Sequence, residues 1–266
     1  MSEMLNRNFS IFKGEVIKEF NETKRYKLSF LSDIIVYYLV FLLMYFIIKG
    51  SMQGMTDLEK SLSISTTIIS YISWFYFSFT LSFICNTISS ETSSGTLEQL
   101  FIGPNGVEKV LNCKMAVIIL KNLIMIVPLA LMIFLTTGCK LIISGYTIII
   151  FLMMIFGVFG LSLILGGLQI YYKNLGQIPF LISILFLGSS YINTSSLPES
   201  INKLLYILPF QKGCELIKYS VSSVSIIKSN DIILLAINSL MYFLIGKFIW
   251  KKMIKKAKKD GRVGSY

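Results

Sequence analysis

The sequence contains no histidine among its 266 residues. This absence excludes HExxH zinc proteases and any mechanism that uses His as acid, base or metal ligand. No CxxC spacing relates the four cysteines, so a metal site built on them is not expected; they are Cys85, Cys113, Cys139 and Cys214. A GxxxxGK[ST] phosphate loop is also missing.

Charge is scarce as well. Only 15% of the residues are charged, whereas a soluble domain usually carries about a quarter. Hydrophobic residues make up 54% of the chain, and the mean hydropathy is +0.70. Long apolar runs separated by charged segments are typical of a polytopic membrane protein. We therefore expect residues 1–266 to form a single all-α transmembrane domain.

Six apolar runs have a length near the roughly 20 residues that a bilayer requires. They predict spans at about 29–48, 63–88, 114–137, 147–170, 178–194 and 231–250. The fourth run carries small residues that permit close helix packing, which is the role we favour for them; they are Gly157, Gly160, Ser162, Gly166 and Gly167.

The net charge of +11 is concentrated near the end of the chain, in residues 251–266. A basic segment directly after an apolar run is the expected composition of a cytoplasmic flank facing anionic lipid. No nucleic-acid-reading motif accompanies it, so nucleic acid is not an expected partner. Placing both termini in the cytoplasm puts most Lys and Arg on that side. We predict a multi-pass protein of the plasma membrane with this orientation, in which Lys121 and Lys247 snorkel toward the cytoplasmic interface.

Residues 1–27 alternate between charged and apolar positions. The apolar ones recur at helical spacing; they are Phe9, Phe12, Val16, Ile17 and Phe20. This pattern predicts an amphipathic helix that lies on the membrane surface.

A polar island, SSETSSGTLEQLFIGP at 89–104, separates the second and third predicted spans. Gly95 allows a sharp exit from the preceding helix. Thr96 and Gln99 have the spacing of a capping box. Gly103-Pro104 is expected to stop the helix. The island thus predicts a short helix over about 95–102.

This short helix is expected to be amphipathic. Leu97, Leu100 and Phe101 fall on one face, while Glu98 and Gln99 point elsewhere. Such an element, tied to two spans, can transmit a push from a soluble partner to the membrane helices.

The same island resembles the motif of ABC-2 type transporter permeases, in which an acidic residue precedes Gly-Thr-Leu-Glu-Gln-Leu, a small residue and Pro. In that family the motif forms the coupling helix that docks into a groove on the ATPase subunit. The resemblance implies that Glu91 is the acidic residue at the end of the second span. It further implies an ATPase contact made by Gly95, Thr96, Leu97, Glu98, Gln99, Leu100 and Phe101.

Residues 196–222 are too broken by Pro and Gly, and too charged, for a seventh span. Leu197-Pro198 and Leu208-Pro209-Phe210 resemble the family's external pattern, in which two short re-entrant helices dip into the outer leaflet. The family often has Asn where this chain has Leu208, and Arg where Lys218 stands.

The resemblance implies a transport subunit rather than an enzyme. It would pair as a homodimer or heterodimer with a second permease chain and bind two copies of an ABC ATPase that carry ATP and Mg²⁺. The cargo would be hydrophobic or amphiphilic, such as a drug, a lipid-linked sugar or a peptide. A smaller ATPase contact would involve Tyr172, Lys173 and Asn174 of the second cytoplasmic loop.

The second span is rich in hydroxyl and aromatic side chains. Helix packing is the favoured role for them, and the alternative is a substrate route walled by Tyr71, Trp74, Phe75 and Phe79. Two other function classes stay open. A stand-alone secondary transporter or channel would show a mid-span carboxylate or an internal repeat, and the sequence has neither, since Asp33 lies near the inner end of its span. A membrane-embedded enzyme would need a catalytic pair within the spans, where only Asp33 and Lys121 are plausible charges.

Overall fold

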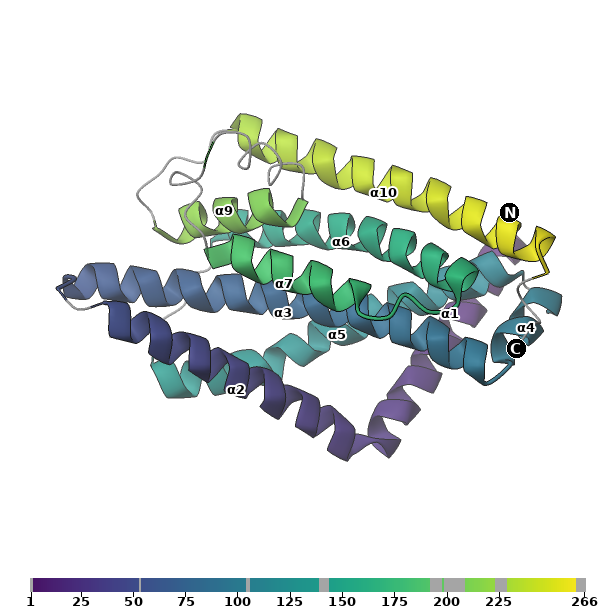
Figure 1. The fold of residues 1–266 in the computed structure, drawn as a ribbon, viewed down its shortest axis with the longest axis horizontal. Coiled ribbons are helices and arrows are strands. Elements are labelled where there is room, and N and C mark those ends of the chain that lie inside the picture. Colours follow the sequence, from purple (N-terminus) through teal and green to yellow (C-terminus); the bar gives the residue numbers. More distant parts are fainter. Residues whose placement is uncertain are drawn as a thin grey trace.

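The computed structural model describes residues 2–52, 54–103, 106–138, 144–191, 198, 209–222 and 229–261. Every regular element in these ranges is an α-helix (Figure 1). The helices are α1 (Ser2–Arg25), α2 (Lys27–Ser51), α3 (Asp57–Ser93), α4 (Thr96–Ile102), α5 (Val107–Thr137), α6 (Gly145–Tyr172), α7 (Ile178–Tyr191), α9 (Pro209–Ser222) and α10 (Ser229–Lys259). Five of them, α2, α3, α5, α6 and α10, are long and apolar enough to cross a membrane. They indicate a multi-pass helical membrane protein.

The predicted span at 178–194 differs from the other five. It falls on α7, which has 14 residues. At the helical rise per residue, α7 is about 21 Å long, shorter than the roughly 30 Å of a bilayer core. A sixth span is therefore not confirmed, and residues 192–194 lie outside the described ranges.

Helix α3 is the centre of the bundle. Within its apolar span 83% of the residues are buried, against 11% in α2. The buried positions of α3 include hydroxyl and aromatic side chains; Thr67, for example, donates a hydrogen bond to the carbonyl of Ser63 at 2.8 Å. Hydroxyl groups bonded to their own helix can be buried in protein, whereas α2, which is apolar and has few Ser or Thr residues, can face lipid. Figure 1 shows α3 in the middle of the bundle and α2 along its edge.

Helices α6 and α10 pack through glycine. A Cβ atom at Gly160 would overlap the backbone of Tyr242 and Phe243, and one at Gly246 would overlap the carbonyl of Gly160. Further along α6, a Cβ at Gly167 would lie 3.2 Å from the Cα of Trp250. Lipid supplies no hydrophobic drive for helix association, so close backbone approach is a principal source of contact in a membrane. The packing role expected for the glycines of this segment fits these contacts.

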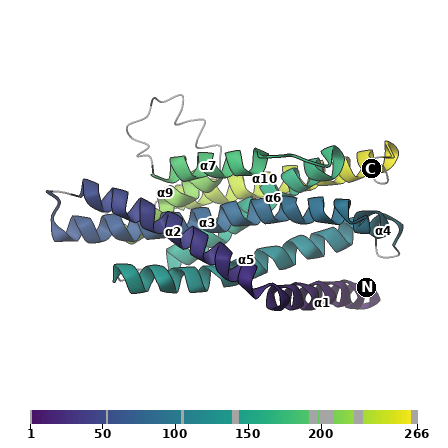
Figure 2. The same cartoon turned by 60° about the horizontal axis from the view of Figure 1, so that its bottom comes forward.

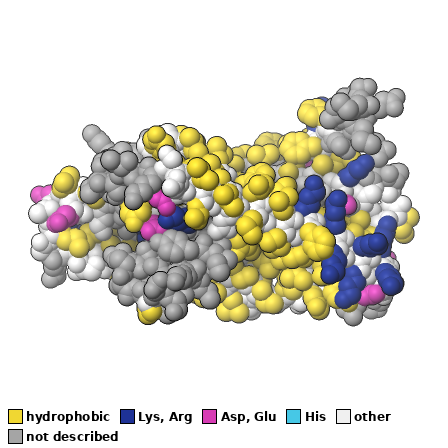
Figure 3. All heavy atoms as spheres, turned by 90° about the horizontal axis from the view of Figure 1, so that it is seen from above, with side chains coloured by type: hydrophobic (Ala, Val, Ile, Leu, Met, Phe, Trp, Pro, Cys, Tyr) yellow, Lys and Arg dark blue, Asp and Glu magenta, His cyan; other side chains and the backbone are white. Residues whose placement is uncertain are grey.

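Helix α4, the C-terminal part of α10 and the start of α1 lie at one end of the bundle (Figures 1 and 2). In Figure 3, a broad hydrophobic zone borders a cluster of Lys and Arg at this end. Exposed lysines of α10 are Lys251, Lys252, Lys255, Lys256, Lys258 and Lys259. We term this the basic end of the protein.

Helix α1 has the amphipathic pattern expected from the sequence. Phe9, Ile17 and Phe20 are exposed, whereas Glu19 is buried against the bundle. The polar face of α1 therefore packs on protein and its apolar face points outward, as a helix at a membrane surface requires.

Replacing Gly160 with Ala should weaken the α6–α10 contact, because the added Cβ meets backbone that cannot rotate away. We expect a loss of about 1–3 kcal/mol, the usual cost of overpacking, read as a lower midpoint of heat unfolding in detergent. Gly145→Ala is the matched control on the same helix, since a Cβ there meets open space. Equal midpoints for the two variants would contradict the contact.

Candidate functional site

The turn between α3 and α4 depends on glycine. Helix α3 ends at Ser93, and Gly95 adopts a φ of 71° before α4 begins at Thr96. Only glycine adopts this left-handed conformation without strain. The chain turns again at Gly106, with a φ of 74°, to enter α5. The predicted short helix is thus present, with its ends within a residue of those expected.

The capping box expected between Thr96 and Gln99 is wrong. Gly95 is the N-cap, and no side-chain hydrogen bond caps α4 in the described part of the chain. The Thr96 hydroxyl donates instead to the carboxylate of Glu91, one turn back on α3, and lies 2.9 Å from the hydroxyl of Ser94. A carboxylate is a stronger acceptor than a neutral group, and its bonds are charge-assisted.

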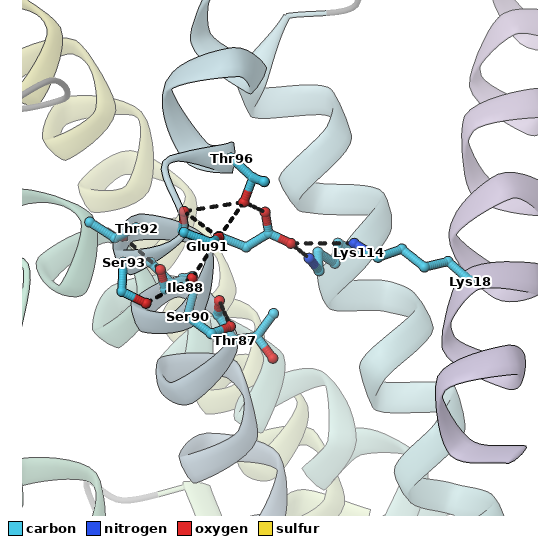
Figure 4. A network of polar contacts seen from close by, with 10 residues as sticks. Lys18, Thr87, Ile88, Ser90, Glu91, Thr92, Ser93, Thr96 and Lys114 are labelled. Atoms are coloured by element: carbon cyan, nitrogen blue, oxygen red, sulfur yellow. Dashed lines mark hydrogen bonds and ion pairs between the residues drawn. The ribbon is translucent and has the colours of Figure 1, made fainter. Parts of the chain in front are cut away.

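Glu91 joins four helices through one carboxylate (Figure 4). Its Oε2 accepts the bond from Thr96 of α4. Its Oε1 pairs with the ammonium of Lys114 on α5 and with that of Lys18 on α1, the latter at 3.4 Å. We term these four residues the Glu91 network. The side chains of Glu91 and Lys114 are only 11% and 6% exposed, so water screens their attraction little.

A second ion pair fastens α1 to α5. Lys121 donates to Glu19 at 2.8 Å and lies 4.5 Å above the ring of Phe83. The sequence predicted that Lys121 could snorkel to the interface, and the structure adds its partner there, a buried carboxylate from α1. A lone Lys in an apolar run was the signal for both Lys114 and Lys121, but nothing in the sequence indicated their partners.

Burial and neighbouring charges shift the pKa values of two side chains on α1. Burial disfavours the charged form of Lys18, yet the nearby Glu91 and Glu15 carboxylates raise its pKa above the ordinary value. Burial raises the pKa of Glu15, and the Lys114 and Lys18 ammonium groups oppose that rise. Both shifts follow from packing a charged helix face against protein instead of water.

The two faces of α4 differ in burial as the sequence predicted. Leu97 is buried in a cluster that includes Leu111 and Trp250, and Leu100 and Phe101 are half-buried beside it. On the outer side Gln99 is exposed and Glu98 is half-buried. Ile102, at the end of the helix, is 87% exposed.

The side chain of Gln169 stabilises the loop after α6 by hydrogen bonds to its backbone. Gln169 is a buried residue that was not predicted from the sequence. Its amide nitrogen donates to the Lys173 carbonyl at 2.8 Å, and its oxygen accepts from the Leu175 amide at 3.0 Å. The side chain of Asn174 accepts from the Gly176 amide at 2.8 Å. The sequence did contain an indication of this role, because Gln169 is an amide side chain one turn before the end of an apolar helix. These bonds give the loop a defined shape.

This loop meets the end of α10. The hydroxyl of Tyr171 donates to Asp260 at 3.1 Å, and the Lys256 ammonium lies 4.4 Å above the Tyr171 ring. The neighbouring Tyr172 is exposed. Lys258 of the same α10 segment lies 5.8 Å above the ring of Phe101 on α4. The α10 segment therefore links the two regions that the resemblance assigns to ATPase contact.

A polar cavity of about 540 Å³ lies behind the Glu91 network, between α1, α2, α3 and the start of α5. A smaller cavity of about 200 Å³ adjoins it and shares four lining residues: Glu22, Asp33, Phe79 and Phe83. Lys18, Glu91 and Lys114 line the larger cavity as well. The residues that hold α4 in place thus also border the largest of these spaces.

The aromatic residues considered for a substrate route lie mainly in the core. Tyr71 donates a hydrogen bond to the Tyr37 carbonyl, and Trp74 donates to the Ser183 carbonyl at 2.7 Å. Phe75 is buried, with its ring centre 4.7 Å from that of Tyr37. Their contacts are those of packing. Phe79 differs, because it lines both cavities.

Part of the predicted re-entrant segment can be described. Pro209 opens α9, and Phe210 is buried with its ring centre 5.0 Å from those of Phe77 and Phe186. Pro198 is exposed. Residues 199–208, which would complete the first of the two expected short helices, lie outside the described ranges.

Replacing Glu91 with Gln should destabilise the protein, because it leaves the buried Lys114 ammonium without its anion. Breaking such a pair costs about 3–5 kcal/mol, to be measured as a lower midpoint of heat unfolding in detergent. The double variant Glu91→Gln with Lys114→Met should regain part of that loss. Glu108→Gln, which breaks the exposed pair with Lys251, should cost less than about 1 kcal/mol. A Glu91 variant no weaker than the Glu108 control would contradict the network.

Comparison with known proteins does not assign the chain to a family. No protein-family model matches the sequence, and the search of curated proteins finds no match. The function is therefore argued from the motif, the geometry of α4 and the chemistry of the cavity.

Proposed function

We propose that the chain is the permease subunit of an ATP-driven ABC exporter of the ABC-2 type, which moves a hydrophobic or amphiphilic substrate out across the plasma membrane. One observation carries the proposal: α4 is a short helix held between two long apolar helices by a buried carboxylate, and it ends in an exposed Ile102. An element of this kind serves to receive a push from a partner. Its sequence is also the segment that resembles the permease motif.

The docking surface of the ATPase comprises α4, the loop with Tyr172, Lys173 and Asn174, and the end of α10. The contacts of Tyr171 with Asp260 and of Lys258 with Phe101 support treating these segments as one surface. The basic end faces the cytoplasm, because membrane proteins keep their Lys and Arg on that side. Both termini are then cytoplasmic, and ATP and Mg²⁺ belong to the partner.

The Glu91 network provides the mechanical link. A displacement of α4 acts on Thr96, passes to the carboxylate of Glu91 on α3, and reaches α5 and α1 through Lys114 and Lys18. The Glu91–Lys114 pair is largely shielded from water, which suits it to transmit a shift, whereas the pair with the half-exposed Lys18 is looser. Two such chains, as a homodimer or with a related permease, would be moved by two ATPase subunits.

On this proposal α7, with the residues that follow it, is the fifth of six spans, and α9 belongs to an external re-entrant segment. The amphipathic composition of α9 and its start at Pro209 support that assignment. Irregular backbone at membrane depth has to be shielded by protein, and the burial of Phe210 against α3 and α7 fits this requirement.

The alternative is a stand-alone secondary transporter or channel. One observation favours it: Asp33 is a carboxylate on an apolar helix that borders two cavities, and intramembrane carboxylates often couple transport to ions. The alternative predicts transport by the chain without any ATPase. Purification in gentle detergent, with bound proteins identified by mass spectrometry, distinguishes the two functions.

Ile102→Asp should release the ATPase, because it places a charge on the exposed apolar end of α4 that enters the partner's groove. We expect the amount of ATPase that copurifies to fall at least about tenfold, a loss of roughly 1.4 kcal/mol in binding. Leu58→Asp is the matched control, an exposed apolar residue at the opposite end of α3. Undiminished copurification with Ile102→Asp would contradict this docking surface.

Glu98→Lys tests the same helix by charge. Reversal of this charge at the ATPase contact should uncouple ATP hydrolysis from export, while the chain still inserts into the membrane. The measurement is export by vesicles that contain the variant, relative to ATP hydrolysed by the same vesicles. A variant that assembles with the ATPase and exports at the wild-type rate would exclude Glu98 from docking.

A further inference from the structure

The two adjoining cavities beside α1 form a space of suitable size for a small ligand. Their volumes are about 540 and 200 Å³, and ligand sites in proteins commonly measure about 300–1,000 Å³. Both cavities border α1 and α2, which carry exposed apolar side chains such as Phe20, Leu28 and Leu31.

The charges that line this space are not balanced. Four carboxylates border the two cavities, and three ammonium groups face them; they are Glu19, Glu22, Asp33 and Glu91, and Lys18, Lys114 and Lys121. Every one of the three ammonium groups already has a carboxylate. Lys18 and Lys114 share Glu91, and Lys121 pairs with Glu19. Glu22 and Asp33 are left without a paired lysine among the described residues.

Asp33 is the more informative of the two. It is half-buried on α2, an apolar helix, and borders both cavities. In the described part of the chain it makes no hydrogen bond and no close ion pair. The Lys121 ammonium acts on it only at longer range and forms its ion pair with Glu19. A carboxylate on a membrane helix is costly, and those that occur usually have a partner or a function. A bound cation would supply the close partner that Asp33 lacks.

Aromatic rings complete the site. Tyr37, Phe79 and Phe83 line the larger cavity together with Asp33. The face of an aromatic ring attracts a cation within about 6 Å of its centre. Lys121 already lies 4.5 Å above the ring of Phe83, so this wall accepts positive charge in the folded protein.

We propose that these cavities bind an organic cation that carries an apolar portion, with Asp33 as its ion partner and Phe79 and Phe83 as its apolar wall. The cation is the substrate class of the exporter, and in that role the inference rests on the proposed function. An amine-bearing lipid headgroup and a free organic cation share this chemistry. Glu91 also lines the larger cavity, which places the ligand next to the network that holds α4.

The test is binding of radiolabelled tetraphenylphosphonium to the purified full chain in detergent, by equilibrium dialysis, without any ATPase. The matched probe is tetraphenylborate, which has the same shape and the opposite charge. We expect the cation to bind and the anion not to bind. Asp33→Asn should weaken cation binding at least about tenfold, whereas Asp33→Glu and the distant Asp57→Asn should retain it.

A second variant keeps the test decisive if Asp33→Asn fails to fold. Asn86 is exposed and lines the larger cavity, so Asn86→Lys should be tolerated and should remove cation binding by placing a charge in the space. Cation binding unchanged in both variants would overturn the proposal, as would equal binding of tetraphenylborate. Displacement of the probe by phosphatidylethanolamine in mixed micelles assigns the site to a lipid headgroup, and lack of displacement assigns it to a free cation.

Failure of this inference and failure of the proposed function are distinguishable. ATPase copurification is measured on the same preparations. Copurification without cation binding would leave the permease and overturn this site. Cation binding without any ATPase would support the site and favour the secondary transporter.

Discussion

The buried carboxylate of Glu91 is the interaction on which the arrangement of the basic end depends. Taking a carboxylate and an ammonium group out of water is costly, and the pair is stable only where geometry and further hydrogen bonds compensate. Here Lys114, Lys18 and the hydroxyl of Thr96 supply them. Because these partners come from three other helices, the position of α4 is tied to the packing of α1, α3 and α5.

The rest of the bundle follows from a division between side chains that suit protein and side chains that suit lipid. Helix α3 brings hydroxyl and aromatic groups to the interior, where they bond to backbone or pack on one another. The outer helices expose apolar side chains, and α2 is the least buried of the candidate spans. Between α6 and α10, glycine permits backbone contact that larger residues would prevent.

On the proposed function, transport and coupling would share residues. Lys18, Glu91 and Lys114 belong to the network that holds α4 and also line the larger cavity. A cation bound near Asp33 would alter the field at Glu91, and a displaced α4 would alter the shape of the cavity. The proposed substrate and the proposed ATPase would therefore act on one set of charges, which would give their coupling a physical basis.

The sequence by itself determined the membrane class, five of the long helices, the amphipathic α1 and the short α4 with its glycine turn. These features depend on local composition and spacing, because a bilayer demands long apolar runs and a left-handed turn demands glycine. Only the tertiary structure decided the roles of Thr96, Lys114 and Lys121, the length of α7 and the site around Asp33. The pairs Glu91–Lys114, Glu91–Lys18 and Glu19–Lys121 join residues 23, 73 and 102 positions apart. Pairs at such separations form only where packed helices bring the charges together, and no local pattern records that.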